Sequence, residues 1–258
     1  MMLGEPTKKI LFRSTLLVFL LAIVGVDTLY AQGSGSPQIN LSFGSGNGTE
    51  DFSAMVQVLI FITIITFGPA FITMMTSFTR IIIVFFFLRM GLGTQQSPPN
   101  QVLLGLALFL TIFIMAPTFN TINDEAIQPY LNDTITQKVA LNRASVPIKQ
   151  FMIKQTRDKD LLMFMDMAKM KAVKDAQEIP LYVVVPSYII SELRIAFQIG
   201  FLLYLPFMVI DLVVASVLLS MGIMFLPPVL VSLPFKILVF VLTDGWYLLV
   251  ESLIRSFK

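Results

Sequence analysis

The sequence predicts an all-α integral membrane protein that is built from helical hairpins and carries a small helical domain outside the bilayer. Hydrophobic residues make up 56% of the 258 residues, and the mean hydropathy is +0.82. Charged residues make up 13%, against ~25% in an average soluble domain. Half of the charges, 17 of 34, lie between residues 120 and 180. A soluble domain of this length could not bury so much apolar surface.

The residue types that are missing restrict the chemistry. The chain has 0 His and 0 Cys, which excludes Ser–His and Cys–His catalysis, His or Cys zinc sites, iron–sulfur clusters and disulfides. We expect no enzyme, cofactor or metal, and without a nucleotide motif any energy must come from a partner. An intramembrane hydrolase with Asp211 and Asp244 as a dyad, and a transporter with inverted repeats, are the weaker alternatives. The net charge of +2 gives no support for a nucleic-acid partner.

Residues 1–31 have the order of a bacterial signal peptide. Three basic residues precede an apolar run over Ser14–Val26, and the small Ala31 follows. We expect cleavage after Ala31, with an uncleaved anchor as the alternative. Residues 32–51 are rich in Gly, Ser and Asn, and this composition predicts a flexible linker.

Residues 52–119 predict an N-terminal membrane hairpin, whose only charges are Arg80 and Arg89. Pro69 interrupts the first apolar block, so we expect a kinked or broken helix there. The second block, Val102–Phe119, has 18 residues and is long enough to cross a bilayer core of ~30 Å. If the signal peptide is cleaved, the first span runs inward. Both arginines then lie near the cytoplasmic face, as the positive-inside tendency requires.

Residues 120–180 predict a charged helical domain in the periplasm. The region holds nine basic and eight acidic residues. Apolar side chains recur among them at spacings of three and four from Met152 to Ala168, which is typical of amphipathic helices. The second span returns outward in the orientation given above, so this domain follows on the periplasmic side.

Residues 181–258 predict C-terminal membrane helices, and hydropathy leaves two long or three short helices open. Five charged residues lie in this apolar sequence: Glu192, Arg194, Asp211, Lys236 and Asp244. An unpaired buried charge costs several kcal/mol, so we expect these residues in buried pairs or at subunit contacts. Glu192 and Arg194 lie about 200° apart on a helix and cannot pair. We expect Glu192 to pair with Lys236, within or between protomers, with a proton or ion relay as the alternative.

The Met-rich segment, Ser220–Pro228, is an apolar turn. It contains Met221, Gly222, Ile223, Met224 and Phe225, followed by the helix-breaking Pro227 and Pro228. Irregular backbone at membrane depth requires cover by protein or a cavity. Met fills gaps without a fixed geometry. The segment therefore fits either a hairpin turn whose side chains fill a core or a compliant hydrophobic constriction.

A series of motifs between about Met55 and Trp246 follows an order found in a known family. The motifs are Met75–Val84, Leu88–Arg89, Leu92–Val102, Gly105–Thr111, Pro186–Leu193, Ala196–Phe201, Pro206–Phe207, Ile210–Asp211, Leu233–Lys236, Phe240–Val241 and Asp244–Trp246. Together they closely resemble the FliP family of flagellar type III export-gate proteins. The signal peptide and the linker fall outside the resemblance.

The resemblance implies an oligomeric gate subunit in the bacterial inner membrane, at the flagellar basal body. Its partners would be copies of itself, five in all, the membrane subunits FliQ and FliR, other flagellar export-apparatus proteins, and the unfolded flagellar subunits that are exported. Met221–Phe225 would be the Met-rich loop that seals the pore, although Ile223 and Phe225 depart from the Met-Met-Met pattern of some members. The homologous subunit of a virulence injectisome is the alternative.

Overall fold

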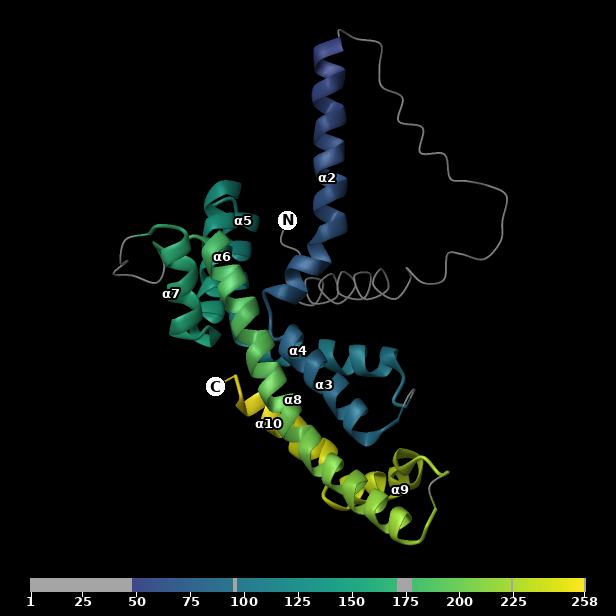
Figure 1. Cartoon of the computed structure of the whole chain (residues 1–258). Helices are drawn as coiled ribbons and strands as arrows, with labels where there is room; N and C mark the ends of the chain where they lie inside the picture. The colour runs from purple at the N-terminus through teal and green to yellow at the C-terminus, as the bar shows by residue number, and fades with distance from the viewer. Residues whose placement is uncertain (1–47, 95–96, 171–177, 224, 258) are drawn as a thin grey trace, which may run out of the picture. The chain divides into compact units, whose positions relative to one another are not determined.

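The computed structural model describes residues 48–94, 97–170, 178–223 and 225–257. The expected signal peptide, most of the expected linker and Met224 lie outside these residues. Every regular element in the described ranges is a helix, which confirms an all-α integral membrane protein (Figure 1). The chain divides into two compact units, residues 1–58 and 59–258. Helix α2 (Gly48–Met74) runs across this boundary, and the second unit contains all the helices that follow it.

Two helices follow α2 within the predicted N-terminal hairpin, the first in its first apolar block and the second in its second block. They are α3 (Phe78–Leu92) and α4 (Asn100–Ile122). Pro69 lies inside α2, so the helix is not broken there, and the chain leaves the helical conformation at residues 75–77. α3 ends at Gly93, whose φ of 74° places it in the left-handed region that glycine tolerates best.

The charged region is helical, as its sequence pattern predicts. Its elements are the π-helical turn η2 (Asn123–Ile127), α5 (Gln128–Leu131), α6 (Gln137–Gln155) and α7 (Asp158–Met167). The first two continue directly from α4, so the apolar span passes into the charged region without a loop. The first turn of α7 carries two acidic residues, Asp158 and Asp160. Their negative charges interact favourably with the positive end of the helix dipole.

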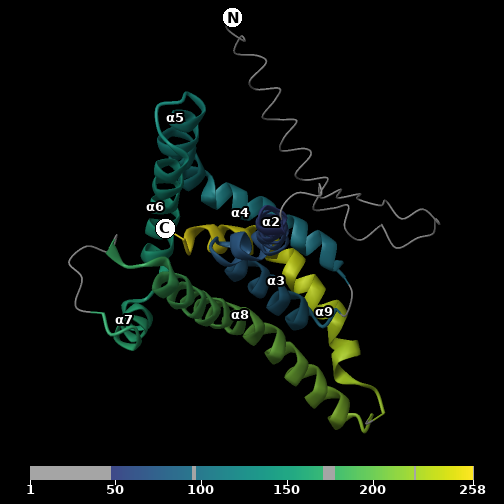
Figure 2. The ribbon, with the colours of Figure 1, turned by 90° about the horizontal axis from the view of Figure 1, so that it is seen from above.

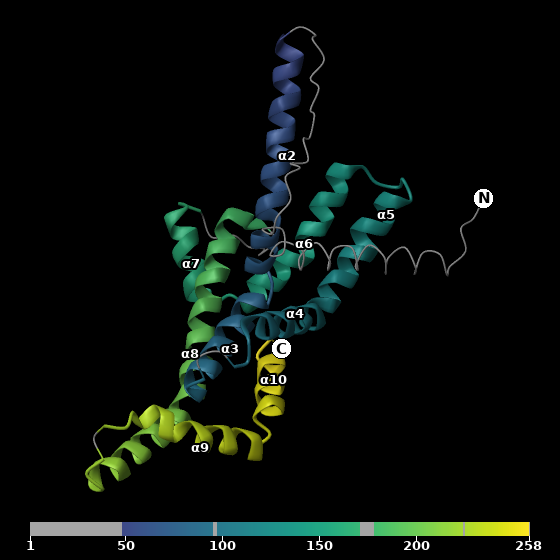
Figure 3. The ribbon, with the colours of Figure 1, turned by 90° about the vertical axis from the view of Figure 1, so that its right-hand side faces the viewer.

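The C-terminal region contains one long helix and two short ones. The long helix, α8, spans Leu181–Ser220 and continues through Pro186 and Pro206. Its 40 residues extend about 60 Å, twice the ~30 Å of a hydrocarbon core. The short helices are α9 (Pro228–Leu242) and α10 (Gly245–Arg255), and they meet at an angle of 65° (Figure 3).

Among the described residues, two segments are long and apolar enough to cross a membrane. They are Asn100–Leu131 and Leu181–Ser220, and the bent pair α9–α10 would be a third if it forms one span. These spans rest on length and composition. They agree with a membrane protein that has two or three crossings in this part of the chain.

Helix α8 connects two hydrophobic clusters. The first joins α8 to α3, α4, α9 and α10, and α3 lies alongside α8 in two views (Figures 1 and 2). The second joins the start of α8 to α6 and α7, where Met152, Met165 and Tyr188 are buried. The contact between α3 and α8 is close, because a Cβ on Gly200 would lie 2.9 Å from the Cβ of Phe87. This packing holds the helices that carry the candidate site.

Candidate functional site

The Met-rich segment forms the turn at which α8 ends and α9 begins. Met221 is 66% exposed and Phe225 is 84% exposed. Side chains so exposed fill no core within the chain, so the core-filling interpretation does not hold for a single molecule. An exposed apolar turn of this kind is available to another protein chain.

The backbone is fixed at both ends of the Met-rich segment, by hydrogen bonds at the end of α8 and by a proline at the start of α9. The N–H of Ile223 donates to the carbonyl of Leu218, and the N–H of Gly222 donates to the carbonyl of Leu219, each at 3.0 Å. These two bonds form a Schellman motif, and Gly222 provides the left-handed residue that it requires, with φ 74°. At the other end, Pro228 occupies the first position of α9, where the missing N–H costs nothing.

An ion pair between a buried lysine and a partly exposed aspartate holds α9 to α8 near this turn. Lys236 is 1% exposed, and its Nζ lies 2.7 Å from Oδ2 of Asp211. The same Nζ donates to the carbonyl of Gly91 at 3.0 Å, close to the end of α3. The hydroxyl of Ser232 donates to the other carboxylate oxygen of Asp211. Lys236 therefore links α3, α8 and α9 through one ammonium group.

A second ion pair, with both partners buried, lies at the other end of α3. Arg80 is 1% exposed and Glu192 is 0% exposed. Nε of Arg80 donates to Oε2 of Glu192 at 2.8 Å, and Nη2 donates to Oε1. Two parallel bonds of this kind fix both the distance and the orientation of the two helices.

Arg80 also binds the segment that follows α10. Its Nη1 donates to the carbonyl of Ser256 at 2.7 Å, and its Nη2 donates to Oε1 of Gln155 at 3.2 Å. The ring of Phe257 lies 3.7 Å from the guanidinium carbon, within range of a cation–π interaction. One arginine thus joins α3, α6, α8 and the end of α10.

Within one chain, the expected pairing of Glu192 with Lys236 is wrong. The fold places Lys236 beside the end of α3 and Glu192 beside its start, so each binds a different partner. Arg194 does not pair with Glu192, as expected from their spacing. Arg194 and Asp244 are exposed in the single chain, so neither is a buried charge. Their role at a subunit contact stays a proposal.

The sequence patterns did not identify Arg80 as the partner of Glu192, and they did not single out a polar group around Asp160. Arg80 could have been found, because it is one of only two charges in residues 52–119. Asp160 lies in a region rich in charges, where no sequence feature distinguishes it. Among the described residues, no group of three or more His, Cys, Asp or Glu could hold a metal ion.

The carboxylate of Asp160 connects α7 to α8. It accepts bonds from Nε and Nη2 of Arg157 at 2.9 and 2.8 Å, and the hydroxyl of Ser191 donates to it at 2.6 Å. The hydrogen bond from Arg157 is the largest cause that lowers the pKa of Asp160 from 3.8 to about 2, and the bond from Ser191 acts in the same direction. The ionised form is therefore stabilised in the folded chain.

Acid is expected to loosen this contact. Because the pKa of Asp160 is lower in the folded chain than in the unfolded chain, the unfolded chain binds the proton first as pH falls. The stabilisation is complete above about pH 5 and is lost as pH falls toward about 2. In detergent, the Tm of Asp160→Asn should fall less steeply over this range than that of the wild type. Asp158→Asn, an exposed change on the same helix, should keep the wild-type slope, and an equal slope for all three would contradict the assignment.

A model of the FliP family matches residues 61–253, which is most of the chain. The chain belongs to the FliP family. The match covers the ion pairs of Glu192 and Asp211 as well as the Met-rich segment, so these features lie inside the part that defines the FliP family.

Several FliP proteins are similar to this chain over most of its length. The flagellar biosynthetic protein FliP of Bacillus subtilis is 55% identical over 213 residues, which cover 83% of this chain and 96% of that protein. FliP of Pectobacterium carotovorum is 50% identical over 211 residues, which cover 82% of each chain. FliP of Aquifex aeolicus is 49% identical over 224 residues, which cover 86% of this chain and 92% of that protein.

Proposed function

We propose that this chain is a core subunit of the flagellar type III protein export gate. Several copies, with FliQ, FliR and other export-apparatus proteins, form the inner-membrane channel through which unfolded flagellar subunits pass. Membership of the FliP family supports this function, and so do the names of the relatives, each of which is a flagellar biosynthetic protein. These names favour the flagellar apparatus over a virulence injectisome.

The observation that carries the proposal is the exposed Met-rich segment. Copies arranged around an axis would bring Met221, Ile223, Met224 and Phe225 together from each turn. Apolar side chains that meet in a ring exclude water and ions, and unbranched Met can move aside for a passing polypeptide. In this arrangement the channel closes because apolar side chains pack against one another, and it needs no catalytic group or cofactor.

The apolar helices support an assembly in which copies cover one another. α8 is about twice as long as a bilayer core is thick. Large apolar side chains such as Phe201, Leu212 and Val213 remain more than half exposed along it. Lipid alone cannot cover the whole helix, so further subunits are required. In the proposed orientation, the signal peptide is cleaved after Ala31. The charged domain, residues 120–180, then lies in the periplasm.

The seal is tested by shortening its side chains. Replacing both Met224 and Phe225 by Ala should let small polar solutes enter cells through the assembled gate, because the constriction loses the atoms that close it. Uptake of a membrane-impermeant dye or sugar measures the leak. Leu162→Ala, a change at an exposed apolar residue of α7, is the matched control and should not leak. Normal permeability of the double variant in a fully assembled complex would contradict the seal.

A further inference from the structure

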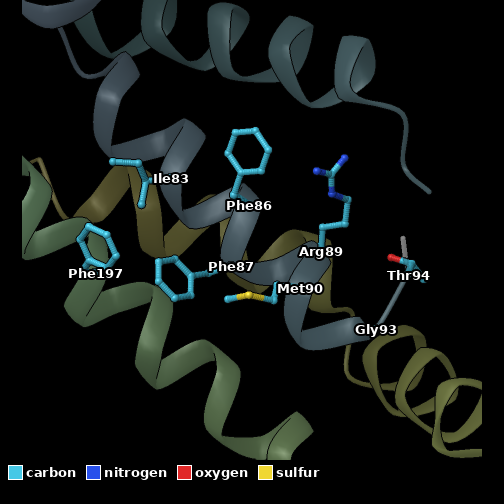
Figure 4. A pocket seen from close by; sticks show the side chains of 8 residues that line it. All are labelled: Ile83, Phe86, Phe87, Arg89, Met90, Gly93, Thr94 and Phe197. Carbon is cyan, nitrogen blue, oxygen red and sulfur yellow. The ribbon is translucent and has the colours of Figure 1, made fainter. Parts of the chain in front are cut away.

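A pocket of about 550 Å³ lies on the side of α3 between α4 and α8 (Figure 4). Its volume is in the range of small-molecule sites. One part of the wall is apolar and consists of Ile83, Phe86, Phe87, Met90 and Phe197. Phe87 and Phe197 meet edge to face, with ring centroids 5.4 Å apart, and form the floor against α8. The apolar part suits a hydrocarbon chain.

The other end of the pocket is polar and positively charged. Arg89 lies there, and its guanidinium donates to Oδ1 of Asn100 and lies over the ring of Phe86 at 5.2 Å. In the described part of the chain, no carboxylate lies within ion-pair distance of Arg89. Lys236, whose Nζ would lie 3.7 Å from a Cβ on Gly93 of the pocket wall, is already paired with Asp211.

Two further features add to the attraction for an anion at this end. α4 begins at Asn100 without a side-chain cap, so the positive end of its dipole adjoins Arg89. The hydroxyl of Thr94 is buried and has no partner among the described residues. Figure 4 shows this hydroxyl directed toward the side of the pocket. It can donate one hydrogen bond to a phosphate oxygen.

We propose that an anionic phospholipid occupies this pocket. Its phosphate binds Arg89, the hydroxyl of Thr94 and the amino end of α4, and an acyl chain lies along the aromatic wall. The two parts of the pocket match the two parts of such a lipid. The site does not depend on the gate function proposed above.

A second copy of this chain is the competing occupant. It would have to bring a carboxylate to Arg89. In the described helices α8, α9 and α10, Glu192, Asp211 and Glu251 are already in ion pairs. Asp244 is the exposed carboxylate on these three helices, and the charged domain carries others, such as Asp124 and Asp166. A lipid needs no such coincidence, because it supplies both the anion and the apolar chain.

The test measures which lipids stay bound to the full chain, extracted from membranes in mild detergent with its partners. Native mass spectrometry should find retained phosphatidylglycerol. Arg89→Gln should reduce the retained fraction about five-fold, the factor expected for one basic side chain near anionic lipid. Arg89→Lys, which keeps the charge, should retain most of the lipid. Arg255→Gln, a change at an exposed arginine of α10, should retain as much as the wild type.

Equal loss of lipid from the Arg89 and Arg255 variants would overturn the proposal, because it would show only general charge attraction. Loss from Arg89→Lys as great as from Arg89→Gln would also overturn it. Since the chain has 0 Cys, cysteines placed at Met90 and Asp244 test the competing occupant. A disulfide between copies at these positions would show that protein, not lipid, covers the pocket, whereas free labelling of Met90→Cys that phosphatidylglycerol blocks would support the lipid.

Discussion

Arg80→Ala is expected to lower the free energy of unfolding by about 3–5 kcal/mol, as the loss of one partner of a buried ion pair does. The substitution leaves the carboxylate of Glu192 buried without a cation, and it leaves Ser256 and Gln155 without their donor. Typical domains have about 5–15 kcal/mol of stability in total. We therefore expect a large fall in Tm in detergent and little protein in the membrane, measured by unfolding scans and immunoblot.

Arg80→Lys separates the charge of this residue from its shape. Lysine keeps the positive charge, but its ammonium group cannot make two parallel bonds to Glu192 and still reach Ser256 and Gln155. An intermediate loss of stability is expected. Arg255→Ala is the control, because it removes only an exposed pair with Glu251, worth no more than about 0.5 kcal/mol. If Arg80→Ala were as stable as this control, the buried network would not hold the fold together.

Lys236→Ala is expected to have a smaller effect, about 1–3 kcal/mol, because the carboxylate of Asp211 that it leaves behind is partly exposed. The change removes the cation from Asp211 and the donor from the carbonyl of Gly91, so α9 loses its polar attachment to α3 and keeps only the hydrogen bond from Ser232 to Asp211 of α8. The Met-rich segment lies between α8 and α9, so loss of this attachment should also impair export. Tm in detergent and motility in soft agar measure the two effects.

Second-site changes identify the partner of Lys236. Lys236→Met combined with Asp211→Leu should recover most of the lost stability, because apolar residues of similar volume can replace a largely buried pair. Lys236→Ala combined with Glu192→Gln should be worse than either change alone, since Glu192 serves Arg80. Rescue by the Glu192 change would instead indicate a Glu192–Lys236 pair between protomers.

The class of the fold and most of its helices follow from patterns along the sequence. Apolar blocks predicted the membrane helices, and spacings of three and four from Met152 to Ala168 predicted α7 and the end of α6. The continuity of α8 could not be predicted in this way. Pro186 and Pro206 each remove a backbone hydrogen bond and usually end or kink a helix. Here Val183, Val184 and Phe207 beside them are buried, and this packing offsets the cost of the prolines.

The partners of the buried charges depend on tertiary distances that the sequence does not contain. The sequence shows that Glu192 needs a cation, but Arg80 and Lys236 are equally plausible by composition. The choice follows from the length of α8, on which Glu192 and Asp211 lie about 28 Å apart. Glu192 therefore binds Arg80 at the start of α3, whereas Asp211 binds Lys236 of α9 beside the end of α3. The Met-rich segment was predictable in position, whereas its exposure required the structure.

The Schellman motif at Gly222 has a consequence for the speed of gating. It fixes the backbone where α8 ends, so the aperture proposed here would change mainly through the rotamers of side chains such as Met221. Rotamer changes of exposed residues take picoseconds to nanoseconds, far less than the microseconds to milliseconds of domain motions. Such an opening would adapt to each successive residue of a translocating polypeptide and would close again behind its last one.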